Sequence, residues 1–162
     1  MLCACSAPPE PVRDPSRPDL RLERVAIRSW SADKLRVVMT ATRLDLFREV
    51  GTPGEVVATD AGLLNVADGS RLTAPLVTGN IFSGQFEGKG GVRMAGPGSL
   101  AAGTPTVAFD RAAGLASSDA GVVLTRPGLR LEAQSFSYDV GEEHATFEGA
   151  KTDFARVKEP ME

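Results

Sequence analysis

The sequence predicts an all-β domain of stacked antiparallel strands. Apolar and polar residues alternate over short stretches that end in turn signals, which is the pattern of strands with one buried face. One hairpin frame also recurs at intervals of about 30 residues, within the range that stacked repeats show. Together these two observations predict about a dozen short strands and essentially no helix.

Residues 1–19 are expected to form a leader and a linker ahead of the domain. Five of the 11 prolines lie in this segment, and a Pro-rich chain is held extended without building a core. The stretch 2–6 (LCACS) resembles a bacterial lipoprotein processing site, and by that resemblance Cys5 would carry the lipid. The alternative is a disordered N-terminus with two idle thiols, since Cys3 and Cys5 are too close for a comfortable disulfide.

Three strands are expected to open the domain. The first runs from Leu20 to Trp30, where apolar residues alternate with charged ones. Residues 34–47 fit either a strand or a helix by spacing, but adjacent valines, two threonines and the absence of helix caps favour a strand. A turn at 51–54 (GTPG) then leads to a third strand at Glu55–Thr59.

Three repeats of the hairpin frame follow. Each opens on a glycine before an apolar residue and turns at a second glycine, in the pairs Gly62 and Gly69, Gly91 and Gly98, Gly121 and Gly128. The last two repeats end on an aromatic residue and an aspartate, Asp110 or Asp139. The apolar face of one repeat is too small to bury alone, so several repeats would share a continuous core. The alternative is an ordinary β-sandwich with regular turns.

The remaining segments are connections and a last strand. We expect a loop at 88–91 (GKGG), hairpin turns at 111–114 and 139–143, and a final strand at Ala145–Lys151. The domain would therefore span residues 20–154 and be followed by a polar tail at 155–162. A bulge is expected near Gln134–Ser135, because the apolar residues on either side of it differ in parity.

Composition and motifs argue against several classes of function. The formal net charge of −3, with no block of Lys and Arg, argues against nucleic-acid binding. His144 is the only histidine, so convergent metal ligands are lacking, and the stretch 84–90 has the wrong spacing for a phosphate loop. Asp110 and Asp139 close hairpins, where aspartate caps turns, rather than forming a glycosidase pair. We therefore expect a non-enzyme without a cofactor, and no apolar run is long enough to cross a bilayer.

A family resemblance covers roughly residues 35–151 and is strongest from Gly79 onward. The segments are TVAFD at 106–110, SDAGVVL at 118–124, GLRLEA at 128–133, FSYD at 136–139 and FEG at 147–149. They resemble the LptC family, periplasmic components of lipopolysaccharide export that are related in fold to the LptA and OstA proteins. The resemblance implies an open β-jellyroll whose apolar interior takes the acyl chains of lipopolysaccharide. Such a component would accept lipopolysaccharide from an inner-membrane ABC transporter and pass it to an LptA-like periplasmic bridge.

Aligning the repeats places one apolar row on the inner face of the stack. By the resemblance, the lipid-binding residues of the trough would be Met39, Leu63, Val92, Met94, Val107, Phe109, Val122, Leu124, Leu131, Phe136, Tyr138 and Phe147. The alternative is a structural β-solenoid in which the same row forms a dry core and binds no lipid.

A stack of strands also leaves two open edges, and open edges invite added strands. We expect a partner edge at each end, with Leu22 and Ile27 at one end and Phe147 and Gly149 at the other. The C-terminal edge would pair with the next jellyroll. Family members usually hold the membrane through an N-terminal transmembrane helix, whereas this protein would be anchored in the periplasm through Cys5 or a missing upstream segment. An LptA-like role therefore stays open.

Overall fold

The computed structural model describes residues 17–48, 53–140, 142 and 144–154, so the leader with Cys5 and the polar tail lie outside it. The all-β prediction is confirmed: in these ranges the only helical segment is one 3₁₀ turn, η1 (Pro97–Ser99). The strands are β1 (Leu20–Ser31), β2 (Lys34–Phe47), β3 (Glu55–Asn65), β4 (Arg71–Asn80), β5 (Gln85–Gly96), β6 (Leu100–Asp110), β7 (Leu115–Ser118), β8 (Val122–Arg126), β9 (Leu129–Ala133), β10 (Ser135–Asp139), β11 (His144–Glu148) and β12 (Lys151–Phe154).

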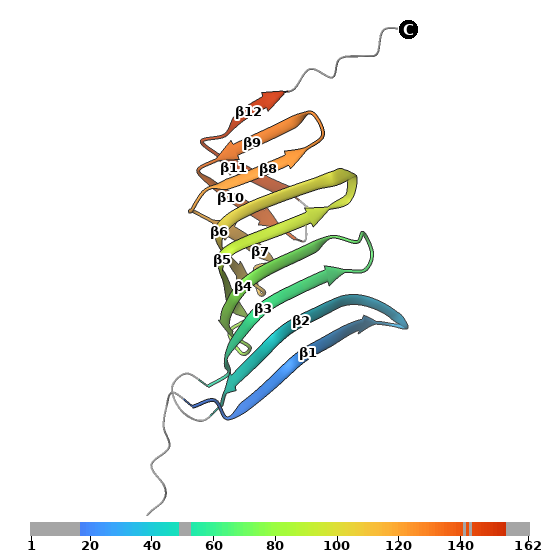
Figure 1. The fold of residues 1–162 in the computed structure, drawn as a ribbon, viewed down its shortest axis with the longest axis vertical. Helices are drawn as coiled ribbons and strands as arrows, with labels where there is room; N and C mark the ends of the chain where they lie inside the picture. The colour runs from blue at the N-terminus through green and yellow to red at the C-terminus, as the bar shows by residue number, and fades with distance from the viewer. Residues whose placement is uncertain (1–16, 49–52, 141, 143, 155–162) are drawn as a thin grey trace, which may run out of the picture.

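The strands form one antiparallel sheet that forks after β6. Strands β1 to β6 pair in chain order. The second half of β6 then pairs with β7, and its first half pairs with β8. Beyond the fork, β10 and β11 continue from β7, whereas β9 and β12 continue from β8. Figure 1 shows β8, β9 and β12 in front of β7, β10 and β11, so the forked sheet has two layers.

The two layers extend through the whole sheet, because the long strands contribute to both. Their pairing is interrupted near the middle of each strand, and we call the line of interruptions the corner. The first wall comprises residues 20–23, 43–47, 55–59, 76–80, 85–89 and 106–110 with β7, β10 and β11. The second wall comprises 25–31, 34–41, 61–65, 71–74, 92–96 and 100–104 with β8, β9 and β12.

The residues at the corner explain why the strands bend there. Pro75 and Pro105 have no N–H to give to a sheet ladder. Gly90 and Gly91 have φ values of 85° and 95°, a region that residues with a side chain rarely adopt. The expected loop at 88–91 is therefore wrong, because the chain stays within β5 and the glycines bend the strand instead.

The turns at the far side of the first wall are capped in the same way at intervals of about 30 residues. The Asp110 carboxylate accepts hydrogen bonds from the N–H groups of Ala112 (2.8 Å) and Ala113 (3.0 Å). Asn80 accepts equivalent bonds from the N–H groups of Phe82 and Ser83. Asp139 accepts one from the N–H group of Glu142. The hydrogen bond from the N–H group of Ala113 is the main cause that lowers the pKa of Asp110. These side chains cap turns, as expected.

Hairpins recur at the predicted interval of about 30 residues, although the boundary of the first repeat differs from the prediction. Gly62 lies within β3, opposite Thr73 of β4, so it does not occupy the corner. Asp60 lies there instead, with a φ of 49°. The predicted strand at Glu55–Thr59 therefore continues through the first half of the first repeat as one strand, β3. By contrast, β2 has the predicted bounds and β1 extends only one residue beyond the predicted Trp30.

The last predicted strand is divided between the walls. Residues 145–151 were expected to be continuous, but β11 pairs with β10 and β12 pairs with β9. Gly149 stands between them with a φ of 62°, and a Cβ built on it would lie 2.8 Å from Gln134 Cδ. Gln134 itself separates β9 from β10. The expected bulge near Gln134–Ser135 is thus a complete crossing from one wall to the other.

Candidate functional site: an apolar trough between two walls

Cross-strand pairing places the apolar residues of the first wall on one face. One row runs Leu22, Leu44, Ala58, Val77, Gly88 and Val107. The next row runs Leu20, Leu46, Val56, Gly79, Phe86, Phe109, Ala116, Tyr138 and Ala145. Phe136 and Phe147 pair on this face too, with ring centroids 6.5 Å apart.

The second wall presents a matching apolar face. Its central row runs Ile27, Met39, Leu63, Leu72, Met94, Ala102, Leu124 and Leu131. Val92 pairs with Thr104, and Val122 pairs with Ala133, on the same face. The paired rows named for the two walls contain no charged residue, so together they form an uncharged lining.

The two faces meet at the corner, which forms a packed floor. A Cβ built on Gly88 of the first wall would lie 3.5 Å from Ala74 Cβ of the second. The hydroxyls of Thr104 and Ser118, both buried, lie 3.0 Å apart across the same junction. Because the Thr104 hydroxyl donates to the Thr106 carbonyl (3.0 Å), the Ser118 hydroxyl must donate to Thr104. The floor is therefore closed by contacts between the walls.

The lining is much less covered away from the corner. Met39, Leu63 and Met94 are 39%, 37% and 37% exposed, although all three lie on the inner face. Among the described residues, no large side chain is fully buried. The space between the walls is consequently an open trough with a packed floor and an accessible apolar lining.

All twelve residues predicted to bind lipid lie on the inner faces of the two walls. Val92 and Val122 are buried in the floor, and the others lie higher on the walls. The alignment of the internal repeats did not include Ile27, Leu72 and Phe86. These three residues also face the trough, between the predicted positions. Their alternation was visible in the sequence, but only the strand register shows which face they occupy.

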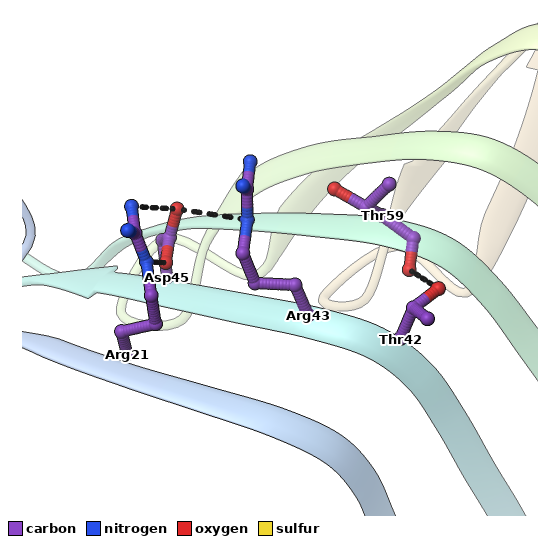
Figure 2. Close-up of polar contacts among 5 residues, drawn as sticks. All are labelled: Arg21, Thr42, Arg43, Asp45 and Thr59. Carbon is purple, nitrogen blue, oxygen red and sulfur yellow. Dashed lines mark hydrogen bonds and ion pairs between the residues drawn. The ribbon is translucent and has the colours of Figure 1, made fainter.

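The N-terminal end of the trough is held by an ion cluster on the outer side of the first wall. Arg21 of β1 donates to Asp45 of β2 through Nε (2.7 Å) and Nη2 (3.2 Å), and Arg43 Nε lies 3.4 Å from the same carboxylate. Figure 2 shows dashed contacts from both arginine side chains to the Asp45 carboxylate. The hydrogen bond from Arg21 is the main cause that lowers the pKa of Asp45. The cluster therefore ties the edge strand to its neighbour.

The predicted partner edges lie at the ends of the sheet. Leu22 and Ile27 belong to β1, whose only strand partner among the described residues is β2. Phe147 belongs to β11, which within the same ranges pairs with β10 alone. Gly149 lies at the corner rather than within an edge strand, so its small size serves the crossing between the walls. Whether partners dock at these edges stays a prediction.

The described residues hold neither a cluster of metal ligands nor a helix suited to span a membrane. No group of three or more His, Cys, Asp and Glu side chains within the described ranges is placed to hold a metal ion. Among the same residues, no helix has the length and apolar character that spanning a membrane requires. The trough offers a long apolar surface without charged groups, which suits the binding of extended apolar chains.

Comparison with known proteins reveals a likeness in fold. No family model matches the chain, and no curated protein matches it in sequence. Among solved structures, it is similar to LptH of Pseudomonas aeruginosa, described as the LptA-homologous periplasmic component of the conserved lipopolysaccharide transport device. The identity is 14%, the match covers 77% of this chain and 89% of the other, and the TM-score is 0.51. The protein is thus an open β-jellyroll of the LptA type.

Proposed function

We propose that this protein carries lipopolysaccharide, with the acyl chains lying in the trough between the walls. The observation that supports this most is an uncharged apolar lining that stays partly exposed along the whole ladder from Ile27 to Leu131. Each acyl methylene that moves from water onto such a surface contributes about 0.8 kcal/mol. The likeness to a jellyroll from a lipopolysaccharide transport device supports the same cargo.

The alternative of a structural solenoid with a dry core is less well supported. A dry core would bury its large side chains, since close packing is what stabilises a protein interior. Here the buried apolar residues are small or medium-sized: Val56, Ala58, Ala74, Val92, Val122 and Ala133. The larger Leu63, Met39 and Met94 remain more than a third exposed.

Within export, we propose the LptC-like position. The protein would accept lipopolysaccharide from an inner-membrane ABC transporter and pass it to an LptA-like bridge protein in the periplasm. It would be anchored through Cys5 or an upstream segment. The unpaired outer sides of β1 and β11 supply the edges at which neighbouring jellyrolls would add strands. An LptA-like place within the bridge is the alternative that the same fold allows.

A photo-crosslinking residue placed on either face of one strand tests the cargo. We expect lipopolysaccharide adducts in the native envelope from Met94 and from Phe109, which face the trough. Arg93 is the matched control, because it neighbours Met94 on β5 and faces outward. Absence of adducts at both inward positions in a folded protein would overturn the proposal. Equal adducts from Arg93 would show that contact is not confined to the trough.

The place in the pathway is tested at the edges. A crosslinking residue at Thr146, on the edge strand β11, should trap an LptA-like protein. One at Ile27, on β1, should trap a transporter component instead. If both positions trap copies of the same bridge protein, the LptA-like role replaces the LptC-like one. A substitution at Gly149 would test the fold rather than docking, because that residue forms the crossing between the walls.

A further inference from the structure

The two walls differ in charge. The charged residues concerned are not part of the paired rows that line the trough. In the stretches that β1 to β6 contribute to the second wall there is no Asp or Glu, and the basic residues are Arg28, Lys34, Arg36, Arg71 and Arg93. The matching stretches of the first wall hold both signs, with basic residues Arg21, Arg43 and Lys89. The excess positive charge is therefore concentrated on one wall.

The basic residues of the two walls also differ in their partners. Arg21 and Arg43 are paired with Asp45, and Lys89 lies 2.7 Å from Glu87. Within the described parts of the chain, none of the five basic residues in these β1 to β6 stretches of the second wall has a side-chain hydrogen bond or an ion pair. Since internal partners do not neutralise them, their charge is available to an external one.

The register places Arg28, Arg71 and Arg93 on the outer surface of the second wall. Arg28 pairs with Val38, Val38 pairs with Leu64, and Leu64 pairs with Arg71. Along each strand these residues alternate with those of the trough lining. Arg71 and Arg93 border a shallow depression whose floor is formed by small residues, including Ala95, Ala101 and Gly103. Two unpaired guanidinium groups beside an apolar floor suit a phosphate group with an apolar attachment.

An exposed tryptophan lies at the N-terminal end of the same wall. Trp30 is 60% exposed and is the only tryptophan in the sequence. The register shift between Ser29 and Trp30 adds one residue to β2, so β1 keeps its alternation and Trp30 lies on the side of Arg28. Lys34 pairs with Ser31 and therefore lies on the opposite side. Tryptophan together with Lys and Arg is the composition that proteins present at the boundary between a bilayer and water.

We propose that the outer face of the second wall docks on an anionic phospholipid membrane surface. The face would lie against the phosphate groups, with Arg71 and Arg93 binding headgroups and Trp30 entering the interface. A bilayer fits these observations better than an acidic protein does, because the cations are spread over four strands rather than all gathered around one pocket. This docking is separate from the cargo trough, which opens on the other side of the wall.

Vesicle sedimentation tests the proposal with the full chain carrying Cys5→Ser, so that no lipid on Cys5 contributes. We expect binding to vesicles of phosphatidylethanolamine with phosphatidylglycerol and none to pure phosphatidylcholine. Removing two charges by R71Q/R93Q should weaken binding about 25-fold, at roughly fivefold for each charge. The matched control K89Q/R111Q removes two charges from the first wall and its turns, and should leave binding nearly unchanged.

Tryptophan fluorescence supplies an independent readout of the face that binds. Emission from Trp30 should shift to the blue on vesicle binding, since it is the only tryptophan. The variant Leu63→Asp, which places a charge in the trough, should bind vesicles as the parent does. Absence of vesicle binding would overturn the proposal and favour an acidic protein partner. Binding that survives R71Q/R93Q, or that leaves Trp30 emission unchanged, would also overturn it.

The membrane proposal and the cargo proposal can be refuted independently of each other. R71Q/R93Q should keep the lipopolysaccharide adducts at Phe109, because both substituted residues face away from the trough. Loss of those adducts together with vesicle binding would mean that a single site serves both ligands, and would overturn a separate docking face.

Discussion

Truncating one residue of the trough floor and one of its upper wall should give opposite effects on stability and cargo binding. Val92 is 3% exposed, whereas Met94, two residues later on the same face of β5, is 37% exposed. A Cβ built on Gly88 would lie only 3.1 Å from Val92 Cγ2, so the valine fills the angle between the walls. The pair Val92→Ala and Met94→Ala therefore compares floor with wall at almost the same point in the sheet.

The expected cost at the floor follows from the atoms removed. Val92→Ala deletes the equivalent of two methylene groups, worth about 1.6 kcal/mol in transfer free energy at about 0.8 kcal/mol each. The cavity left behind raises the loss to about 2–2.5 kcal/mol, because a floor where two walls meet cannot collapse freely. Met94→Ala removes a larger side chain from a site already partly in water, so we expect a loss of about 1 kcal/mol.

Urea unfolding measures the free energy of unfolding of both variants. An unchanged slope of that free energy against urea concentration shows that the unfolded state is the same in each. Crosslinking of lipopolysaccharide at Phe109 should fall in Met94→Ala and persist in Val92→Ala under conditions where each variant is folded. If Met94→Ala were as costly as Val92→Ala, the upper walls would be packed as a core. That result would refute the distinction between floor and lining, and with it the open trough.

Three further outcomes are expected. Because Arg21 lowers the pKa of Asp45, the stabilisation from that pair is complete above the ordinary aspartate pKa and is lost as the pH falls through the lowered folded-state pKa. Asp45→Asn should accordingly destabilise the protein at neutral pH and flatten the acid limb of its urea midpoint, whereas an unchanged acid limb would contradict the assignment. Gly149→Ala should lower the thermal stability more than Gly69→Ala does. Both glycines have positive φ, but only a Cβ at position 149 would crowd a neighbouring side chain. Equal losses of stability in thermal unfolding would exclude that contact. Thr104→Val should cost about 1–2 kcal/mol by leaving a buried hydroxyl without its acceptor, and addition of Ser118→Ala should recover part of it in a double-mutant cycle; strict additivity would show that the hydroxyls are uncoupled.

The strands and the trough lining could be predicted because alternation is a local property. The residues Val122 and Leu124 and the turn at Pro127–Gly128 predict the hairpin of β8 and β9 without any knowledge of neighbours. Aspartates at the hairpin ends predict capped turns for the same reason, and Asp110 makes those bonds. The inward face of each hairpin then follows from parity.

The corner could not be predicted in the same way, because it depends on the stack. The glycines at 88–91 read as a loop, yet pairing with strands on both sides keeps them inside β5. Asp60 and Arg24 have positive φ values that no local signal in the sequence announces. They adopt them because neighbouring strands bend at the same level, and the gain in pairing offsets the local backbone strain.

By itself, the sequence determined that this protein is all-β, that it repeats about every 30 residues and that one face of each hairpin is apolar, since these properties follow from the order of side chains along the strand. Only the tertiary structure decided that the sheet folds into two walls, that it stays open, and that unpaired basic residues gather on one outer face. Those features depend on strand register and on contacts between residues far apart in the chain, and a shift of one residue in register would reverse every face.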